Sequence, residues 1–139
     1  MSYRESPAPH PLIYIREDKA LAVERETGRT IWTFECPRRI VRMLLAYECV
    51  YLLDMDCTIH CMRAHDGTRL GAVQAGEKAW WGAALLAEDG LVYVATTGGV
   101  TALSPEGKQK WQMTLPPGGS GALPGLGVPG HVCQPDFKE

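Results

Sequence analysis

The sequence lacks several features that mark particular classes of protein. It contains no asparagine, so its turns must rely on Gly, Asp and Pro. No apolar run approaches the roughly 20 residues that a transmembrane helix needs, and residues 1–18 contain no apolar core of signal-peptide length. The formal net charge is only −2, which suggests neither nucleic acid nor a membrane surface as a partner. We therefore expect a cytoplasmic protein.

The cysteines also fit a reducing compartment. There are five of them, an odd number, and we expect reduced thiols of which some act as small core residues. They are Cys36, Cys49, Cys57, Cys61 and Cys133. The chain of 139 residues, with 45% apolar and 22% charged residues, is long enough for one ordinary domain with a buried core.

Three segments of the chain repeat one another: residues 12–34, 49–73 and 91–113. Each has an aliphatic residue followed by tyrosine near its start, at Ile13 and Tyr14, Val50 and Tyr51, and Val92 and Tyr93. Each also has a turn glycine, and these lie 39 and 40 residues apart, at Gly28, Gly67 and Gly107. A period near 40 with several short strands is typical of the blades of a β-propeller.

The alternation of apolar residues and the turn glycines predict eleven strands. They are 11–16, 19–25 and 29–35 in unit one, 38–46, 49–55, 58–64 and 69–75 in unit two, and 82–88, 91–96, 99–104 and 109–115 in unit three. The fold class is thus all-β, a partial β-propeller of three four-stranded antiparallel blades, the first lacking its inner strand. Residues 38–48 also allow a helix, because Ile40, Met43 and Leu44 would share one face.

The turns carry a motif that resembles the docking motif of quinoprotein-like (PQQ-repeat) propellers, Ala-x-Asp-x-x-Thr-Gly-x-x-x-Trp. Unit one has Ala22, Thr27, Gly28 and Trp32, with Glu24 in place of Asp. Unit three keeps Ala102, Gly107 and Trp111 but has one residue fewer before the turn. Unit two keeps Gly67, with Cys61 at the Ala position and Gly71 at the Trp position.

This resemblance implies structural roles for the motif residues. The tryptophan of an outer strand is expected to pack between two blades, so Trp32→Ala and Trp111→Ala should each destabilise by roughly 3–5 kcal/mol. The resemblance does not extend to quinone chemistry: members with that activity bind calcium partly through Asn and often carry adjacent cysteines, both absent here. We expect no quinone, calcium or other cofactor.

Three blades leave two open sheet edges, which must be covered. We divide the chain into a propeller segment, residues 1–115, and a Gly/Pro-rich flexible tail, residues 116–139. The end of the tail, from His131, is expected either to be disordered or to reach a partner surface or the missing inner strand of unit one. The expected partner is protein, either a second copy or another propeller-containing chain. A dimer is favoured because two copies supply six blades, within the usual range.

No set of side chains predicts catalysis or metal binding. Cys57 and Cys61 would lie about 13 Å apart along a strand, too far for one zinc ion, and His60 would point to the opposite face; His65 follows in the turn. Asp54, Asp56 and Asp66 fit turns better than a calcium loop. Ser120 lacks the Gly-x-Ser-x-Gly pattern of a nucleophile. We expect no enzyme and no metal site.

Two clusters are candidates for ligand or partner contact. Arg38, Arg39 and Arg42 are the only local basic cluster, and guanidinium groups facing a central channel suit carboxylates or phosphates. Trp80 and Trp81 could form a contact surface, since interfaces are enriched in Trp. The function predicted is a non-catalytic scaffold for protein–protein interaction; the alternative is a ligand-binding propeller with a lectin-like or anion site.

Overall fold

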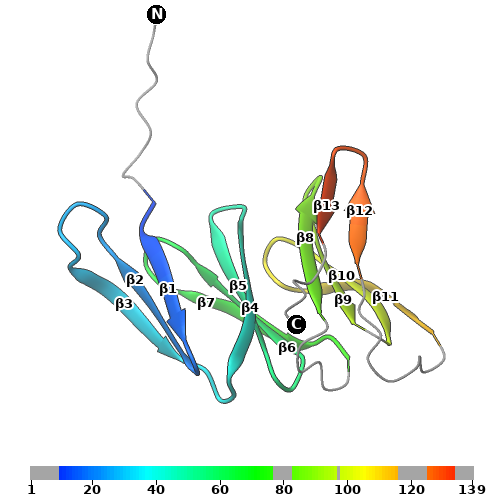
Figure 1. Cartoon of the computed structure of the whole chain (residues 1–139), viewed down its shortest axis with the longest axis horizontal. Coiled ribbons are helices and arrows are strands. Elements are labelled where there is room, and N and C mark those ends of the chain that lie inside the picture. The colour runs from blue at the N-terminus through cyan, green and yellow to red at the C-terminus, as the bar shows by residue number, and fades with distance from the viewer. Residues whose placement is uncertain (1–9, 77–82, 97, 116–124, 134–139) are drawn as a thin grey trace, which may run out of the picture.

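The computed structural model describes residues 10–76, 83–96, 98–115 and 125–133. These residues form thirteen strands and no helix, hence none long and apolar enough to cross a membrane. Figure 1 shows three twisted sheets standing side by side, followed by a short hairpin. The sequence prediction of an all-β partial propeller is confirmed.

Each sheet is one blade with strands hydrogen-bonded in chain order. Blade one contains β1 (Leu12–Arg16), β2 (Lys19–Val23) and β3 (Thr30–Glu35). Blade two contains β4 (Ile40–Ala46), β5 (Cys49–Asp54), β6 (Thr58–Arg63) and β7 (Arg69–Gln74). Blade three contains β8 (Ala84–Glu88), β9 (Leu91–Thr96), β10 (Gly99–Leu103) and β11 (Gln109–Thr114). All eleven predicted strands are present, and blade one has three strands within the described residues, as expected.

The helical alternative for residues 38–48 is wrong. This segment is the inner strand β4, which pairs antiparallel with β5 from Ile40 opposite Asp54 to Ala46 opposite Cys49. Tyr47 and Glu48 make the two-residue turn, both in the left-handed region with φ of 53° and 60°. Such turns match the twist of a hairpin.

The C-terminal segment differs from the predicted flexible tail. Residues 126–133 form a hairpin of β12 (Leu126–Val128) and β13 (His131–Cys133) that lies against β8. Its turn glycine, Gly130, follows Gly90 of the β8–β9 turn by 40 residues, and both have positive φ, 86° and 77°. The hairpin therefore starts a fourth blade. Residues 131–133 pair with β12 and do not supply an inner strand to blade one.

The core lies between the blades, and it defines two faces of each sheet. We call the face that packs on the following blade the front face, and the opposite face the back face. The front of blade one packs on the back of blade two through Ile13, Ala20, Ala22 and Phe34 against Val50, Leu52 and Met62. The front of blade two packs on the back of blade three through Tyr51, Leu53, Ile59 and Cys61 against Leu85, Val92, Val94 and Leu103.

The cross-strand register corrects the alignment of unit one. Ala22 lies opposite Ile13, whereas Cys61 and Ala102, at the same motif position, lie opposite Tyr51 and Tyr93. Ile13 is thus the equivalent of the two tyrosines, and Tyr14 points to the other face. The hairpins of blades one and three have the same length, from Arg16 opposite Lys19 and from Thr96 opposite Gly99, and the tyrosine of blade one lies one residue closer to the turn.

Candidate functional site: the blade faces

Trp32 of β3 makes the contact between the outer parts of blades one and two. Its half-buried ring lies on the turn after β6, and its Nε1 donates a hydrogen bond of 2.8 Å to the Ala64 carbonyl. Gly67 of that turn has φ +76°, and a Cβ there would lie 2.7 Å from Trp32 Cγ. Only glycine both adopts this conformation readily and admits the ring.

The remaining motif residues of blade one support this arrangement from within the blade. Ala22 lies directly opposite Trp32 and is fully buried. The Thr27 hydroxyl donates to the Glu24 carboxylate at 2.6 Å and accepts from Arg29 N at 3.1 Å. The Thr27 hydrogen bond and the Arg29 charge lower the pKa of Glu24. Gly28 closes the same exposed turn with φ +78°. Glu24 thus takes part in this turn through Thr27 and Arg29.

Blades two and three meet without a tryptophan. Gly71 stands at the Trp position, so the turn after β10 approaches blade two directly: a Cβ at Gly71 would lie 3.6 Å from the Glu106 carbonyl oxygen. A Cβ at Gly107 would lie 2.8 Å from Cys61 Cβ. The Tyr51 hydroxyl and the Cys61 thiol both donate to the Pro105 carbonyl. These bonds correspond to the one made by the Trp32 indole in the first interface.

The front face of blade three is open in its outer half. Trp111 lies opposite the buried Ala102 and its ring centroid is 6.2 Å from that of Tyr93, yet it is 46% exposed. Met113, on the same face, is 43% exposed. The expectation that Trp111 is buried between blades is wrong for the single chain, because no turn of a following blade covers it within the described residues.

The back face of blade one is open as well. Leu12 and Tyr14 are 56% and 49% exposed. On blade two the corresponding residues, Val50 and Leu52, are fully buried against blade one. The described residues therefore present two different apolar faces, each of the type that packs on the other inside the molecule.

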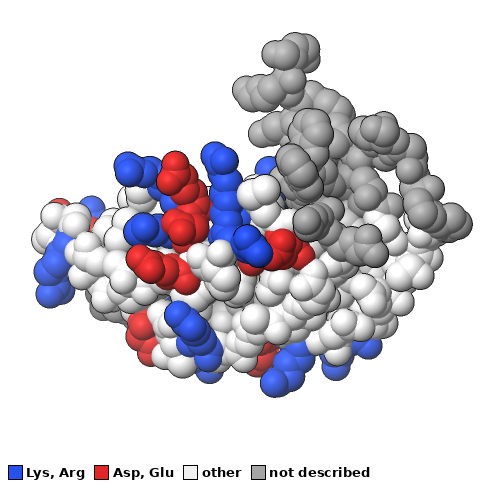
Figure 2. Space-filling model, turned by 90° about the horizontal axis from the view of Figure 1, so that it is seen from below, with Lys and Arg blue, Asp and Glu red and all other residues white. Residues whose placement is uncertain are grey.

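The three arginines do not form a common site. Arg42 Nε donates to the Ala83 carbonyl at 3.1 Å, so its guanidinium joins blades two and three. Arg38 pairs with Asp56 at 2.9 Å on the surface. Arg38 and Arg39 line a cavity of about 530 Å³ together with Glu17, Asp18, Pro37, Met55 and Asp56. Acidic and basic groups also intermingle on the face that Figure 2 shows. Trp80 and Trp81 lie outside the described residues.

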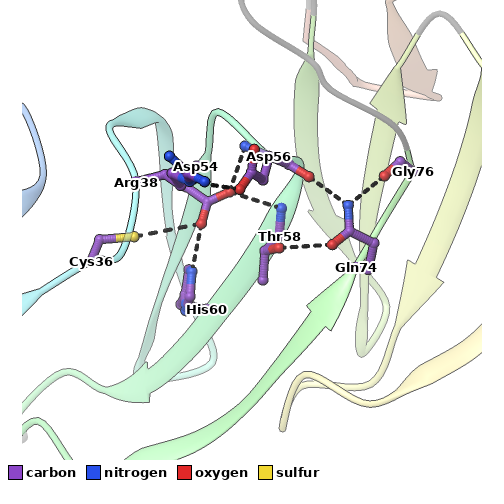
Figure 3. A network of polar contacts seen from close by, with 8 residues as sticks. All are labelled: Cys36, Arg38, Asp54, Asp56, Thr58, His60, Gln74 and Gly76. Carbon is purple, nitrogen blue, oxygen red and sulfur yellow. Dashed lines mark hydrogen bonds and ion pairs between the residues drawn. The ribbon is translucent and has the colours of Figure 1, made fainter.

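A polar network lies where blade one meets blade two (Figure 3). Asp54 Oδ1 accepts from the backbone N–H groups of Asp56 and Thr58, at 2.9 and 3.0 Å, as expected for a turn aspartate. Its Oδ2 lies 2.9 Å from His60 Nε2 and 3.7 Å from Cys36 Sγ. Sequence reasoning tested His60 against Cys57 and Cys61 and missed this grouping, because Cys36 follows the last strand of the preceding blade.

Burial makes the thiols poor nucleophiles. It raises the pKa of Cys36 to about 11 and those of Cys57 and Cys61 to about 12; we call these three the high-pKa thiols. The thiolate is the reactive form of cysteine, so at neutral pH these groups remain protonated. Burial also raises the pKa of Tyr51.

Comparison with known proteins agrees with this geometry. The family model described as outer membrane protein assembly factor BamB matches residues 5–124. The chain belongs to this family. No curated protein gave a significant match. Membership of the BamB-like family accounts for the repeat, the Trp32 contact and the sheet order described above.

Several solved structures share the fold of this BamB-like chain. AztD from Citrobacter koseri superposes with a TM-score of 0.63 at 13% identity, over 76% of this chain and 32% of AztD. BamB from Moraxella catarrhalis superposes with a TM-score of 0.61 at 18% identity, over 78% of this chain and 35% of that protein. A europium-containing methanol dehydrogenase superposes with a TM-score of 0.58 at 14% identity, over 69% of this chain and 21% of that protein. The chain thus spans about a third of the first two structures, and the likeness shows the fold.

Proposed function

We propose that this chain is a non-catalytic β-propeller scaffold for protein–protein interaction, completed by a second copy of itself. The observation that carries the proposal is the pair of open apolar faces: Trp111 and Met113 on the front of blade three, and Leu12 and Tyr14 on the back of blade one. Large apolar side chains exposed together on one sheet face suit an interaction site.

The two faces suit each other. Inside the chain, a front face with an outer tryptophan already packs on a back face through Trp32 and the turn of the next blade. If blade one of a second copy packed against the front face of blade three of the first, the two blades would repeat that contact. Applying the same contact twice gives a closed two-fold ring, in which every blade face is covered by a neighbouring blade.

The hairpin suggests how the ring closes. Blade one begins at its second strand, and β12 lies beside β8 where the inner strand of a following blade belongs. We propose that β12 pairs with β1 of the second copy, in the place that β13 takes in the single chain. The backbone of β1 has a free edge within the described residues, because β1 pairs only with β2, and strand addition uses such an edge.

Two observations support a non-catalytic role. The high-pKa thiols are protonated at neutral pH. The cavity lined by Arg38 and Arg39 also contains the carboxylates of Glu17, Asp18 and Asp56, which does not favour an anion. The ligand-binding alternative therefore has less support than the scaffold.

The test places a charge on each open face and measures assembly by sedimentation velocity. Trp111→Glu and Tyr14→Glu should each shift the protein from dimer to monomer, because a buried unpaired carboxylate is strongly unfavourable in an interface. Lys110→Glu is the matched control, since Lys110 neighbours Trp111 on β11 and is exposed. Equal sedimentation of all three variants and the parent would contradict the proposal.

A further inference from the structure

Three metal-ligating atoms from two blades converge in one place. Cys36 follows β3 of blade one, Asp54 ends β5 and His60 lies on β6 of blade two. Cys36 Sγ, Asp54 Oδ2 and His60 Nε2 all lie within 4.8 Å of one another (Figure 3). Cys36 and Asp54 are 4% and 2% exposed, and His60 is largely buried.

Two of the three distances between these atoms are close to those around a tetrahedral ion. With metal–sulfur bonds of about 2.3 Å and metal–nitrogen or metal–oxygen bonds of about 2.0 Å, neighbouring donors lie roughly 3.3–3.6 Å apart. The sulfur–carboxylate distance is 3.7 Å and the imidazole–carboxylate distance is 2.9 Å. The third pair, sulfur and imidazole nitrogen, lies within 4.8 Å, so these two atoms would have to approach each other by up to about 1.3 Å to share one ion.

The ligands are held in position by neighbouring groups. Two backbone N–H donors occupy Asp54 Oδ1, which leaves Oδ2 directed at His60 and Cys36. The His60 ring packs against Phe34, with centroids 5.6 Å apart. Partners of this kind orient metal ligands and tune their affinity.

The buried carboxylate also lacks a strong counter-charge. No Lys or Arg in the described part of the chain forms an ion pair with Asp54, whose carboxylate contacts His60 and Cys36 and also interacts electrostatically with Cys57. A buried charge is unfavourable unless it is paired or binds a metal ion. A cavity is lined by Pro37 and Met55, the residues that follow Cys36 and Asp54 in the chain.

We propose that Cys36, Asp54 and His60 bind a divalent transition-metal ion, of which Zn²⁺ suits one sulfur, one nitrogen and one oxygen ligand best, with water as the fourth ligand. The ion displaces the thiol proton of Cys36, which passes to solvent, and binds Nε2 of the neutral His60 imidazole, whose one proton then lies on Nδ1, and the Asp54 carboxylate. It joins blade one to blade two across their interface, so its role is structural.

The experiment uses Co²⁺ as a coloured substitute for Zn²⁺, added to the full, reduced chain. We expect one equivalent to produce visible d–d bands of a tetrahedral site and a near-ultraviolet thiolate-to-cobalt band, both removed by Zn²⁺. Cys36→Ser should abolish the thiolate band, and His60→Gln should weaken binding by at least about tenfold. Cys57→Ser is the matched control, because Cys57 is equally buried in blade two and should bind as the parent does.

Circular dichroism of each variant shows whether it folds, and only folded variants are compared. His60→Gln keeps a polar partner for Asp54, which provides a second route should Cys36→Ser unfold. The proposal is overturned if the folded parent gives no thiolate band with stoichiometric Co²⁺. It is also overturned if Cys57→Ser removes the band and Cys36→Ser retains it.

Discussion

Replacing Gly67 with Ala tests the contact between blades one and two with a single methyl group. A Cβ at Gly67 would lie 2.7 Å from Trp32 Cγ and 2.9 Å from its Cδ2. Gly28 has nearly the same backbone angle, φ +78° against +76°, but no atom lies within 4 Å of a Cβ there. The two alanine variants therefore share the backbone strain and differ in the contact with the indole.

The expected losses in free energy of unfolding follow from the backbone strain and the contact with the indole. Alanine in the left-handed region costs about 1–2 kcal/mol, partly offset by about 0.4–1 kcal/mol from the lower entropy of the unfolded chain. Gly28→Ala should thus destabilise by about 1 kcal/mol. Gly67→Ala adds an overpacking cost of about 1–3 kcal/mol, because the ring is held by its hydrogen bond to Ala64.

Urea unfolding at one fixed protein concentration measures both free energies of unfolding. A double variant with Trp32→Ala removes the atoms that collide, so the extra cost of Gly67→Ala should disappear in that background. The reasoning is refuted if Gly28→Ala and Gly67→Ala lower the free energy of unfolding by amounts that agree within about 0.5 kcal/mol. It is also refuted if Gly67→Ala remains more destabilising than Gly28→Ala in the Trp32→Ala background.

Three further predictions concern stability. Trp32→Ala should destabilise by about 3 kcal/mol, whereas Trp111→Ala, measured where the chain is monomeric, should cost less than about 1 kcal/mol; equal losses by urea unfolding would show that Trp32 is not the docking residue. Raising the pH from 8 to 10 should lower the free energy of unfolding by about 1 kcal/mol for each high-pKa thiol, because the thiols ionise only in the unfolded chain in this range. A flat pH profile in chelator-containing buffer would contradict that. Glu48→Gly should stabilise by up to about 1 kcal/mol, because φ is +60° there and a glycine follows the aspartate in the equivalent β8–β9 turn; a lowered melting temperature would count against this.

The strands could be predicted from the sequence because their signals are local. Alternating apolar residues and turn glycines specify each hairpin, and the eleven strands agree with the prediction to within about two residues at each end. Ile40, Met43 and Leu44 have the spacing of a helix face, but they lie on strand β4. This strand pairs with β5, whose residues are all buried. Tertiary packing decided that segment.

Features that depend on packing between blades could not be predicted in the same way. Trp111 has the motif position of Trp32, but its burial depends on a following blade and not on its own strand. The grouping of Cys36 with Asp54 and His60 arises only when two blades meet. The β12–β13 hairpin had a signal, Gly130 at 40 residues from Gly90, which the surrounding Gly and Pro residues obscured.

The molar mass of the unmodified chain in solution tests the central claim most directly. Two open apolar faces predict a dimer at micromolar concentration, with a mass near twice the 15.3 kDa of one chain by light scattering. Dilution should yield monomer only together with loss of stability, since the open faces then meet water. A stable, monodisperse species of single-chain mass across the micromolar range would contradict completion of the propeller by a second copy.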